Sequence, residues 1–163
     1  MTGARKRSFP PVVDARTRLL ILGSLPGEVS LAQAHYYAHP QNQFWRLIGD
    51  VVGRELAPLA YEDRLAALLE TQVGLWDVVA SAERTGSLDG AIRGHEPNDL
   101  RALIASLPEL QAVAFNGGTA ARIGRKAIGD TLLALLDLPS SSPAYTLSFA
   151  AKQLRWQRLA AFL

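Results

Sequence analysis

Side chains able to do chemistry crowd residues 35–43, where the sequence reads HYYAHPQNQ. They are imidazole, phenol and amide groups: His35, Tyr36, Tyr37, His39, Gln41, Asn42 and Gln43. An imidazole can exchange a proton near neutral pH, whereas an amide oxygen can hold a water molecule but does not titrate usefully. Several such groups within nine positions make this stretch a candidate for ligand binding or catalysis.

The elements on either side explain how this stretch is positioned. Residues 19–22 form a continuous run of branched apolar side chains, which predicts a strand buried on both faces of a parallel sheet. Gly23, Pro26 and Gly27 then favour a sharp turn, and Ser24 and Ser30 can satisfy loose amides there. Because ligands of open α/β sheets bind beyond the carboxyl ends of the strands, the polar stretch is expected to line such a crevice.

The remaining pattern alternates strands with helices. Strands are predicted at 73–79 and 110–115, with a further short strand or turn at 132–138. Helices are predicted at 43–52, 61–70, 119–128 and 152–163, and another from Asn98 or Asp99 to 106. This order indicates an α/β fold, a three-layer α/β/α sandwich around a central, mostly parallel sheet.

The segments between these elements are read from their composition. Residues 8–13 (SFPPVV) are expected to lie extended across the sheet, and residues 1–8 to be flexible. Residues 81–98 are rich in glycine and serine, so they are either a functional loop or a surface connection. At 163 residues, the chain (1–163) fits one domain.

Composition excludes several kinds of chemistry. The chain has no cysteine, which rules out disulfides, a cysteine nucleophile and cysteine-ligated iron–sulfur or zinc sites, and no cofactor is expected. No run reaches membrane-spanning length and no apolar segment follows Arg5, Lys6 and Arg7, so we expect a cytoplasmic protein. The net charge of +2 permits a polyanionic partner without requiring one.

Three motifs carry a resemblance to a known family. GSLPGE (23–28), YYAHPQNQFW (36–45) and LPSSSPAY (138–145) resemble the uracil-DNA glycosylase superfamily, most of all its hypoxanthine (deoxyinosine) branch. The AHPxNxFW portion also resembles the mismatch-specific uracil and thymine glycosylases. The resemblance implies a single glycosylase-like domain that flips deaminated bases out of double- or single-stranded DNA, acting as a monomer associated with the nucleoid.

The resemblance also suggests catalytic residues. Leu25 occupies the position where most of the superfamily has an Asp or Asn that holds water, and leucine cannot accept a hydrogen bond. The hypoxanthine branch uses an asparagine slightly downstream, which matches Asn42, with His39 as the second candidate. Asn42 could instead cap the helix that follows it, and the two roles can coexist.

Other residues are assigned to the base. By resemblance, Tyr37 stacks on the flipped base, its alternative being an ordinary core aromatic. Backbone amides of Ser24, Leu25 and Gly27 are expected to stabilise charge on the departing base. Asn116 could read a polar edge of the base or simply precede the turn at Gly117.

Asp77 and the motif at 138–145 each allow a functional and a structural interpretation. Asp77 could orient a donor or serve structure. The motif at 138–145 resembles the loop that pinches the DNA backbone, with short donors for phosphate between stiffening prolines, although it could be a surface turn. It departs from the family at Leu138, and the residue inserted into the DNA stack is left open among Pro143, Ala144 and Tyr145. The proposed phosphate contacts are Ser140, Ser141, Ser142 and Pro143.

The lysines decide between hydrolysis and strand cleavage. A lyase step needs an amine near the sugar, and neither Lys6, Lys126 nor Lys152 lies in a site motif, so we predict a monofunctional enzyme that leaves an abasic site. The alternatives are a uracil or mismatch-specific glycosylase, a catalytically weak protein that binds damaged DNA, and a domain binding a free nucleotide. The last lacks a supporting phosphate-binding motif.

Overall fold

The central sheet has four parallel strands. A computed structural model describes residues 5–163, and its strands are ordered β3 (Val73–Asp77), β2 (Leu19–Gly23), β6 (Ala112–Asn116) and β7 (Ala134–Leu138). All three neighbouring pairs are parallel. Strands β2 and β6 are buried along their whole length, as their continuous apolar runs predict.

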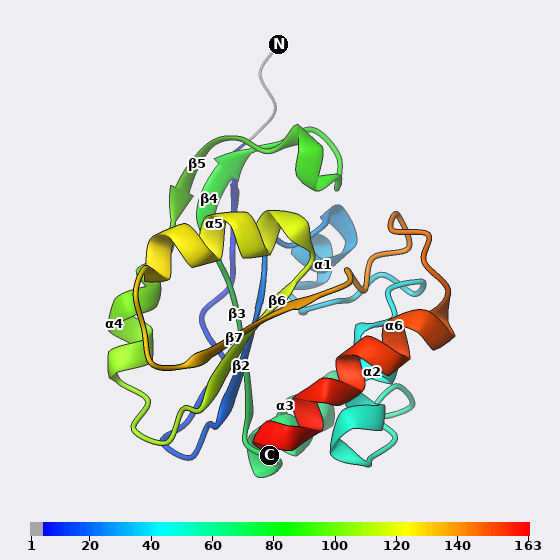
Figure 1. Cartoon of the computed structure of the whole chain (residues 1–163). Helices are drawn as coiled ribbons and strands as arrows, with labels where there is room; N and C mark the ends of the chain where they lie inside the picture. The colour runs from blue at the N-terminus through cyan, green and yellow to red at the C-terminus, as the bar shows by residue number, and fades with distance from the viewer. Residues whose placement is uncertain (1–4) are drawn as a thin grey trace.

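Helices cover both faces of this sheet (Figure 1). On one face lie α4 (Leu100–Ala105) and α5 (Gly118–Ile128), packed on side chains such as Leu20 and Phe115. On the other lie α2 (Phe44–Val52), α3 (Tyr61–Glu70) and α6 (Phe149–Trp156), packed on side chains such as Ile21. Alternate side chains of β2 therefore enter two separate cores, and the predicted three-layer α/β/α sandwich is confirmed.

A second sheet was not predicted. It is antiparallel, in the order β1 (Arg5–Arg7), β4 (Val79–Glu83) and β5 (Arg93–Pro97). The predicted strand 73–79 is in fact two strands in different sheets, and residues 81–98 are not a loop throughout. They contain most of β4, the 3₁₀ helix η1 (Asp89–Ala91) and β5. The alternation of short polar and apolar residues there is too weak to distinguish an exposed strand from a loop.

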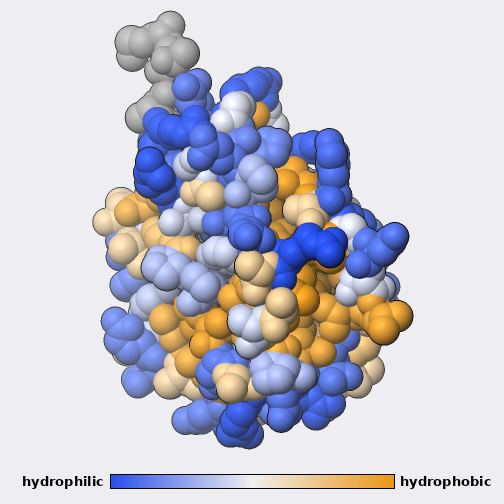
Figure 2. Space-filling model, turned by 90° about the vertical axis from the view of Figure 1, so that its left-hand side faces the viewer, coloured by the Kyte–Doolittle hydropathy of each residue, from blue (hydrophilic) through white to orange (hydrophobic). Residues whose placement is uncertain are grey.

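The second sheet also corrects the expectation for the N-terminus. Residues 5–7, expected to be flexible, pair with β4, and Val12 pairs with Leu75 as the extended segment 8–13 predicted. Residues 1–4 lie outside the described residues. Figure 2 shows one face of the molecule. Its upper part, where the β1–β4–β5 sheet lies, is mostly hydrophilic, and hydrophobic residues gather in the lower part.

The helix predictions are largely correct but differ at the ends. Asp99 caps α4 by accepting a hydrogen bond from the Ala102 amide at 3.1 Å. The C-terminal helix starts at Phe149 rather than 152, because Ser148 accepts from the Ala151 amide, and it becomes the 3₁₀ helix η2 (Gln157–Phe162). A short helix, α1 (Glu28–Gln33), was missed between the turn after β2 and the polar stretch. No helix among residues 5–163 is long and apolar enough to span a membrane.

Candidate active site

A cavity of about 490 Å³ lies at the carboxyl ends of β2, β3 and β6, where Gly23, Asp77 and Asn116 reach it. The site residues predicted from the sequence all lie on its walls: Ser24, Leu25, Gly27, Tyr37, His39, Asn42, Asn116, Ser140, Ser141, Ser142 and Pro143. From the polar stretch, His35, Gln41 and Gln43 do not line it. His35 stacks instead on Tyr61, with ring centroids 3.8 Å apart.

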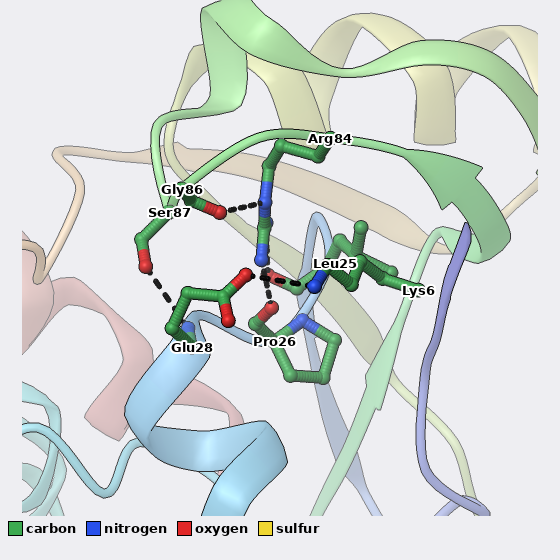
Figure 3. Close-up of polar contacts among 7 residues, drawn as sticks. All are labelled: Lys6, Leu25, Pro26, Glu28, Arg84, Gly86 and Ser87. Atoms are coloured by element: carbon green, nitrogen blue, oxygen red, sulfur yellow. Dashed lines mark hydrogen bonds and ion pairs between the residues drawn. The ribbon is translucent and has the colours of Figure 1, made fainter. Parts of the chain in front are cut away.

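A buried arginine holds the turn after β2 (Figure 3). Arg84 donates from Nε to the Gly86 carbonyl at 2.7 Å, from Nη1 to the Leu25 carbonyl at 3.4 Å, and from Nη2 to the Pro26 carbonyl. Burial lowers the pKa of Arg84, while the neighbouring carboxylates, with Asp89 foremost, act in the opposite direction. The turn is thus fixed against residues about sixty positions away in the sequence.

Two contacts at the start of α1 add to this support (Figure 3). The Glu28 amide donates to the Ser87 hydroxyl at 2.9 Å, and the Glu28 carboxylate pairs with Lys6 at 3.1 Å. These contacts join α1, the loop before η1 and strand β1. The turn and the loop therefore form one wall of the cavity.

The backbone amides of this turn remain free for a ligand. Within residues 5–163, no hydrogen bond from the amides of Ser24, Leu25 or Gly27 is found. The Ser24 side chain is already used, because its hydroxyl donates to Asp89 Oδ1 at 2.6 Å. Burial raises the pKa of Asp89, although this hydrogen bond lowers it.

Tyr37 is held rigidly at the cavity. Its ring stacks on Phe44, with centroids 3.9 Å apart and planes 17° apart, so a base can stack only on the opposite face. Its backbone has a φ of +53°, a left-handed conformation that costs energy in a non-glycine residue. Its hydroxyl is buried and has no hydrogen-bond partner in the described part of the chain. Burial, followed by the charge of Asp77, raises the pKa of Tyr37. The phenol therefore stays protonated.

The two catalytic candidates differ in what their acceptor atoms do. Asn42 Oδ1 accepts from the Phe44 amide at 3.0 Å, so it satisfies the first amide of α2 from the position before the N-cap, Gln43, much as its alternative capping role predicts. His39 is exposed, and its Nδ1 accepts from the Gln41 amide at 3.1 Å. In the neutral imidazole, Nδ1 is therefore the acceptor and Nε2 carries the hydrogen.

Asn116 is paired with the serine loop, defined as residues 139–145. Its Nδ2 donates to the Ser141 hydroxyl, and its Oδ1 accepts from the Ser141 amide, both at 2.9 Å. Both groups are buried. Asn116 thus positions the loop, and only the second hydrogen of its amide nitrogen is left to contact a base.

Lys152 also reaches the serine loop, which the sequence did not suggest. Its Nζ donates to the Ser142 carbonyl at 3.1 Å, and burial lowers its pKa. Trp156 donates to the Pro139 carbonyl at 3.0 Å, so α6 supports the loop from behind. The exposed tip consists of Pro143, Ala144 and Tyr145.

Sequence reasoning missed one wall of the cavity. Ser87, Leu88 and Asp89 line it, from the segment whose function was left open. Leu88 is 63% exposed, and Asp89 bonds to Ser24 across 65 positions. No local sequence signal gives this proximity, because it depends on how the second sheet packs.

Comparison with known proteins agrees with this geometry. A family model described as "Uracil DNA glycosylase superfamily" matches residues 10–162. A hypoxanthine DNA glycosylase from Methanosarcina barkeri is 46% identical over 113 residues, 69% of this chain and 72% of that protein. The corresponding protein of Methanosarcina acetivorans is 45% identical over 112 residues, 69% of this chain and 71% of that protein.

A solved structure extends the likeness to nearly the whole chain. The solution NMR structure of a uracil DNA glycosylase candidate from Methanosarcina acetivorans superposes with a TM-score of 0.85 at 37% identity. The match covers 96% of this chain and 97% of that one. On this evidence, the chain belongs to the uracil DNA glycosylase superfamily.

Proposed function

We propose that the chain is a DNA glycosylase that removes deaminated bases, hypoxanthine above all and also uracil or xanthine, and leaves an abasic site. The observation that carries this proposal is the cavity at the strand ends, whose walls contain every residue predicted for base binding and catalysis. The names of the Methanosarcina relatives support hypoxanthine as the first substrate. In this reaction, water oxygen bonds to C1′, the base departs with the electron pair of the glycosidic bond, and a proton from water ends on the base.

Asn42 is the residue that holds the attacking water in this proposal. The Phe44 amide fixes the orientation of its side chain and occupies one lone pair of Oδ1, which leaves the second lone pair for water. His39 is less suited to accept a proton, because Nδ1 already accepts from the Gln41 amide. An amide cannot remove the proton of water, so most of the acceleration must come from stabilising the leaving base.

The remaining walls have complementary roles. The amides of Ser24, Leu25 and Gly27, which make no hydrogen bond within residues 5–163, stabilise charge on the base. The serine loop contacts phosphates through Ser140, Ser142 and Pro143, whereas Ser141, also expected to do so, is buried and bonded to Asn116. Tyr37 contacts the base through the ring face that Phe44 leaves open. All these groups come from one chain, which is consistent with a monomer acting on DNA.

The test is an excision assay on oligonucleotides carrying one hypoxanthine or one uracil, in duplex and single-stranded form, followed by alkali. We expect strand cleavage after alkali with hypoxanthine, and none before alkali, since hydrolysis is monofunctional. Product from uracil alone would favour the uracil-specific alternative. Tight binding without product would indicate a damage-binding protein, and cleavage before alkali would point to a lyase, with Lys152 as the first amine to replace.

A further inference from the structure

Asp77 is a buried carboxyl group on the cavity wall, and within residues 5–163 neither of its oxygens accepts a hydrogen bond. It ends β3, is 4% exposed, and lines the cavity. Oδ2 is enclosed without a partner, and no hydrogen bond to Oδ1 is found within residues 5–163. Buried carboxyl groups are normally hydrogen-bonded, so one left free beside a ligand cavity calls for a functional explanation.

Gly23 keeps this carboxyl open to the cavity. A Cβ atom at Gly23 would lie 2.6 Å from Asp77 Oδ1 and 2.8 Å from the Tyr37 hydroxyl. Glycine at the end of β2 therefore leaves room for two polar groups to converge beside the turn. Neither group has a partner that explains its position.

The surroundings of Asp77 favour its neutral form. Tyr36 and Tyr37 face it from the segment after α1, Arg84 from the residue that follows β4, and Asp89 from η1. The Arg84 guanidinium donates to backbone carbonyls and does not pair with Asp77. Burial raises the pKa of Asp77 to about 7, the negative charge of Asp89 adds to this effect, and Arg84 opposes it.

We propose that Asp77 is a catalytic residue that contacts the extruded base and donates a hydrogen bond from its carboxyl group to the carbonyl oxygen created by deamination. This inference rests on the proposed glycosylase function and adds a residue to it. The oxygen is O6 in hypoxanthine and O4 in uracil. Asp77 is better placed for this role than Asn116, the other polar side chain at a strand end. The amide group of Asn116 is already hydrogen-bonded to Ser141.

The chemistry explains why a neutral carboxyl group suits this position. When the glycosidic bond breaks, its electron pair moves to the base and negative charge spreads to the carbonyl oxygen. An O–H donor stabilises that charge in proportion to its development, whereas a carboxylate would repel it. A bound base also excludes water from the cavity, which disfavours the charged form further.

The first test is the pH dependence of single-turnover excision from a duplex containing deoxyinosine. We expect the wild-type rate constant to fall about tenfold for each pH unit once the pH exceeds the pKa of Asp77, which is about 7 without ligand and higher when a base fills the cavity. Asp77→Asn, which keeps a neutral donor, should stay within about tenfold of the wild type with a flat profile. Asp77→Leu should lose about a hundredfold, also with a flat profile. A wild-type rate that rises through pH 7, or an unchanged rate in Asp77→Leu, would overturn the proposal.

A control separates Asp77 from the imidazole of His39, which also lies on the cavity wall. Whatever the rate of His39→Gln, we expect this variant to keep the decrease in rate constant above pH 7. Disappearance of the fall in His39→Gln would assign it to the imidazole and refute the role of Asp77.

The second test compares two leaving bases. Purine, as deoxynebularine, lacks O6 but is otherwise shaped like hypoxanthine. The rate ratio of deoxyinosine to deoxynebularine should be about tenfold smaller in Asp77→Leu than in the wild type, and preserved in Asp77→Asn. A purely structural role predicts equal losses on both substrates. If the wild type excises no hypoxanthine, the proposed function itself fails; if it does and Asp77→Leu keeps the full ratio, only this inference fails.

Discussion

The side-chain amide of Asn42 contacts both the start of α2 and the cavity. Its oxygen accepts a hydrogen bond from the first residue of α2, and the same side chain lines the cavity. The cap fixes the amide before any substrate arrives, so a water held on the second lone pair would need little reorganisation. A residue read as a choice between capping and catalysis can thus do both, and the capping contact helps the proposed catalytic one.

Replacing Asn42 by Ala should lower the excision rate by about two orders of magnitude. It should also lower the free energy of unfolding by about 1 kcal/mol, because the cap is lost. Asn42→Asp keeps an acceptor oxygen in the same place and should retain the cap and most of the activity. Single-turnover kinetics and urea unfolding measure the two effects; an unchanged rate in Asn42→Ala would transfer the role to His39 or the backbone.

Gly23→Ala should reduce excision by about tenfold or more, since the added methyl group would displace Asp77 or Tyr37 from the cavity wall. Overpacking there should cost about 1–3 kcal/mol of stability. Gly118→Ala is the matched control, because no atom lies within 4 Å of its Cβ position. Equal activity of the two variants would show that the convergence at Gly23 has no catalytic role.

At the scale of elements, the wall made by the turn after β2 and the loop after β4 depends on one side chain. Arg84 is fully buried and serves three backbone carbonyls from the two segments. Its planar fork matches this set of acceptors, which a single ammonium cannot do. The turn amides that face the base are therefore positioned by a residue that lies far away in the sequence.

Arg84→Lys should consequently lower the excision rate by about 10- to 100-fold while the chain still folds. Unsatisfied carbonyls should reduce the free energy of unfolding by about 1–3 kcal/mol. Arg93→Lys is a suitable control, because Arg93 also donates to backbone carbonyls but is exposed and bonds only locally. Similar rate losses in both variants would contradict the special role of the buried guanidinium.

The whole molecule assembles its cavity from both sheets. The parallel sheet contributes strand ends, and the segment that joins β4 to β5 in the antiparallel sheet adds Ser87, Leu88 and Asp89 to the cavity wall. Figure 1 shows the two sheets and the segment between β4 and β5. This arrangement encloses carboxyl groups of Asp77 and Asp89 whose pKa values burial raises. The stability of the fold must then depend on pH.

Proton linkage gives the direction in which the free energy of unfolding changes with pH. Asp77 has an ordinary pKa near 4 in the unfolded chain and about 7 in the folded one, so between these values the folded chain binds more protons and stability falls as pH rises. Asp77→Asn should therefore be more stable than the wild type by about 1–3 kcal/mol at pH 8, and no more stable below about pH 4. Urea unfolding at the two pH values measures this; a difference that does not change with pH would exclude linkage through Asp77.

The sequence by itself determined the layered architecture and many of the residues that line the cavity. Buried strands such as β2, helices such as α5 and the Asp99 cap follow from periodicity and local chemistry, and the residues of three motifs all reach one cavity. Those features depend on neighbours a few positions apart, which a pattern can record.

Only the tertiary structure decided how the site residues are paired and supported. It divided the strand at Asp77 between two sheets, joined Asn116 to Ser141 across 25 positions, and set Arg84 beneath the turn after β2. It also brought Lys152 to the serine loop and left the Asp77 carboxyl group without a hydrogen-bond partner among the described residues. The physical reason is that hydrogen bonds and burial between distant segments depend on packing of the whole chain, which no local pattern contains.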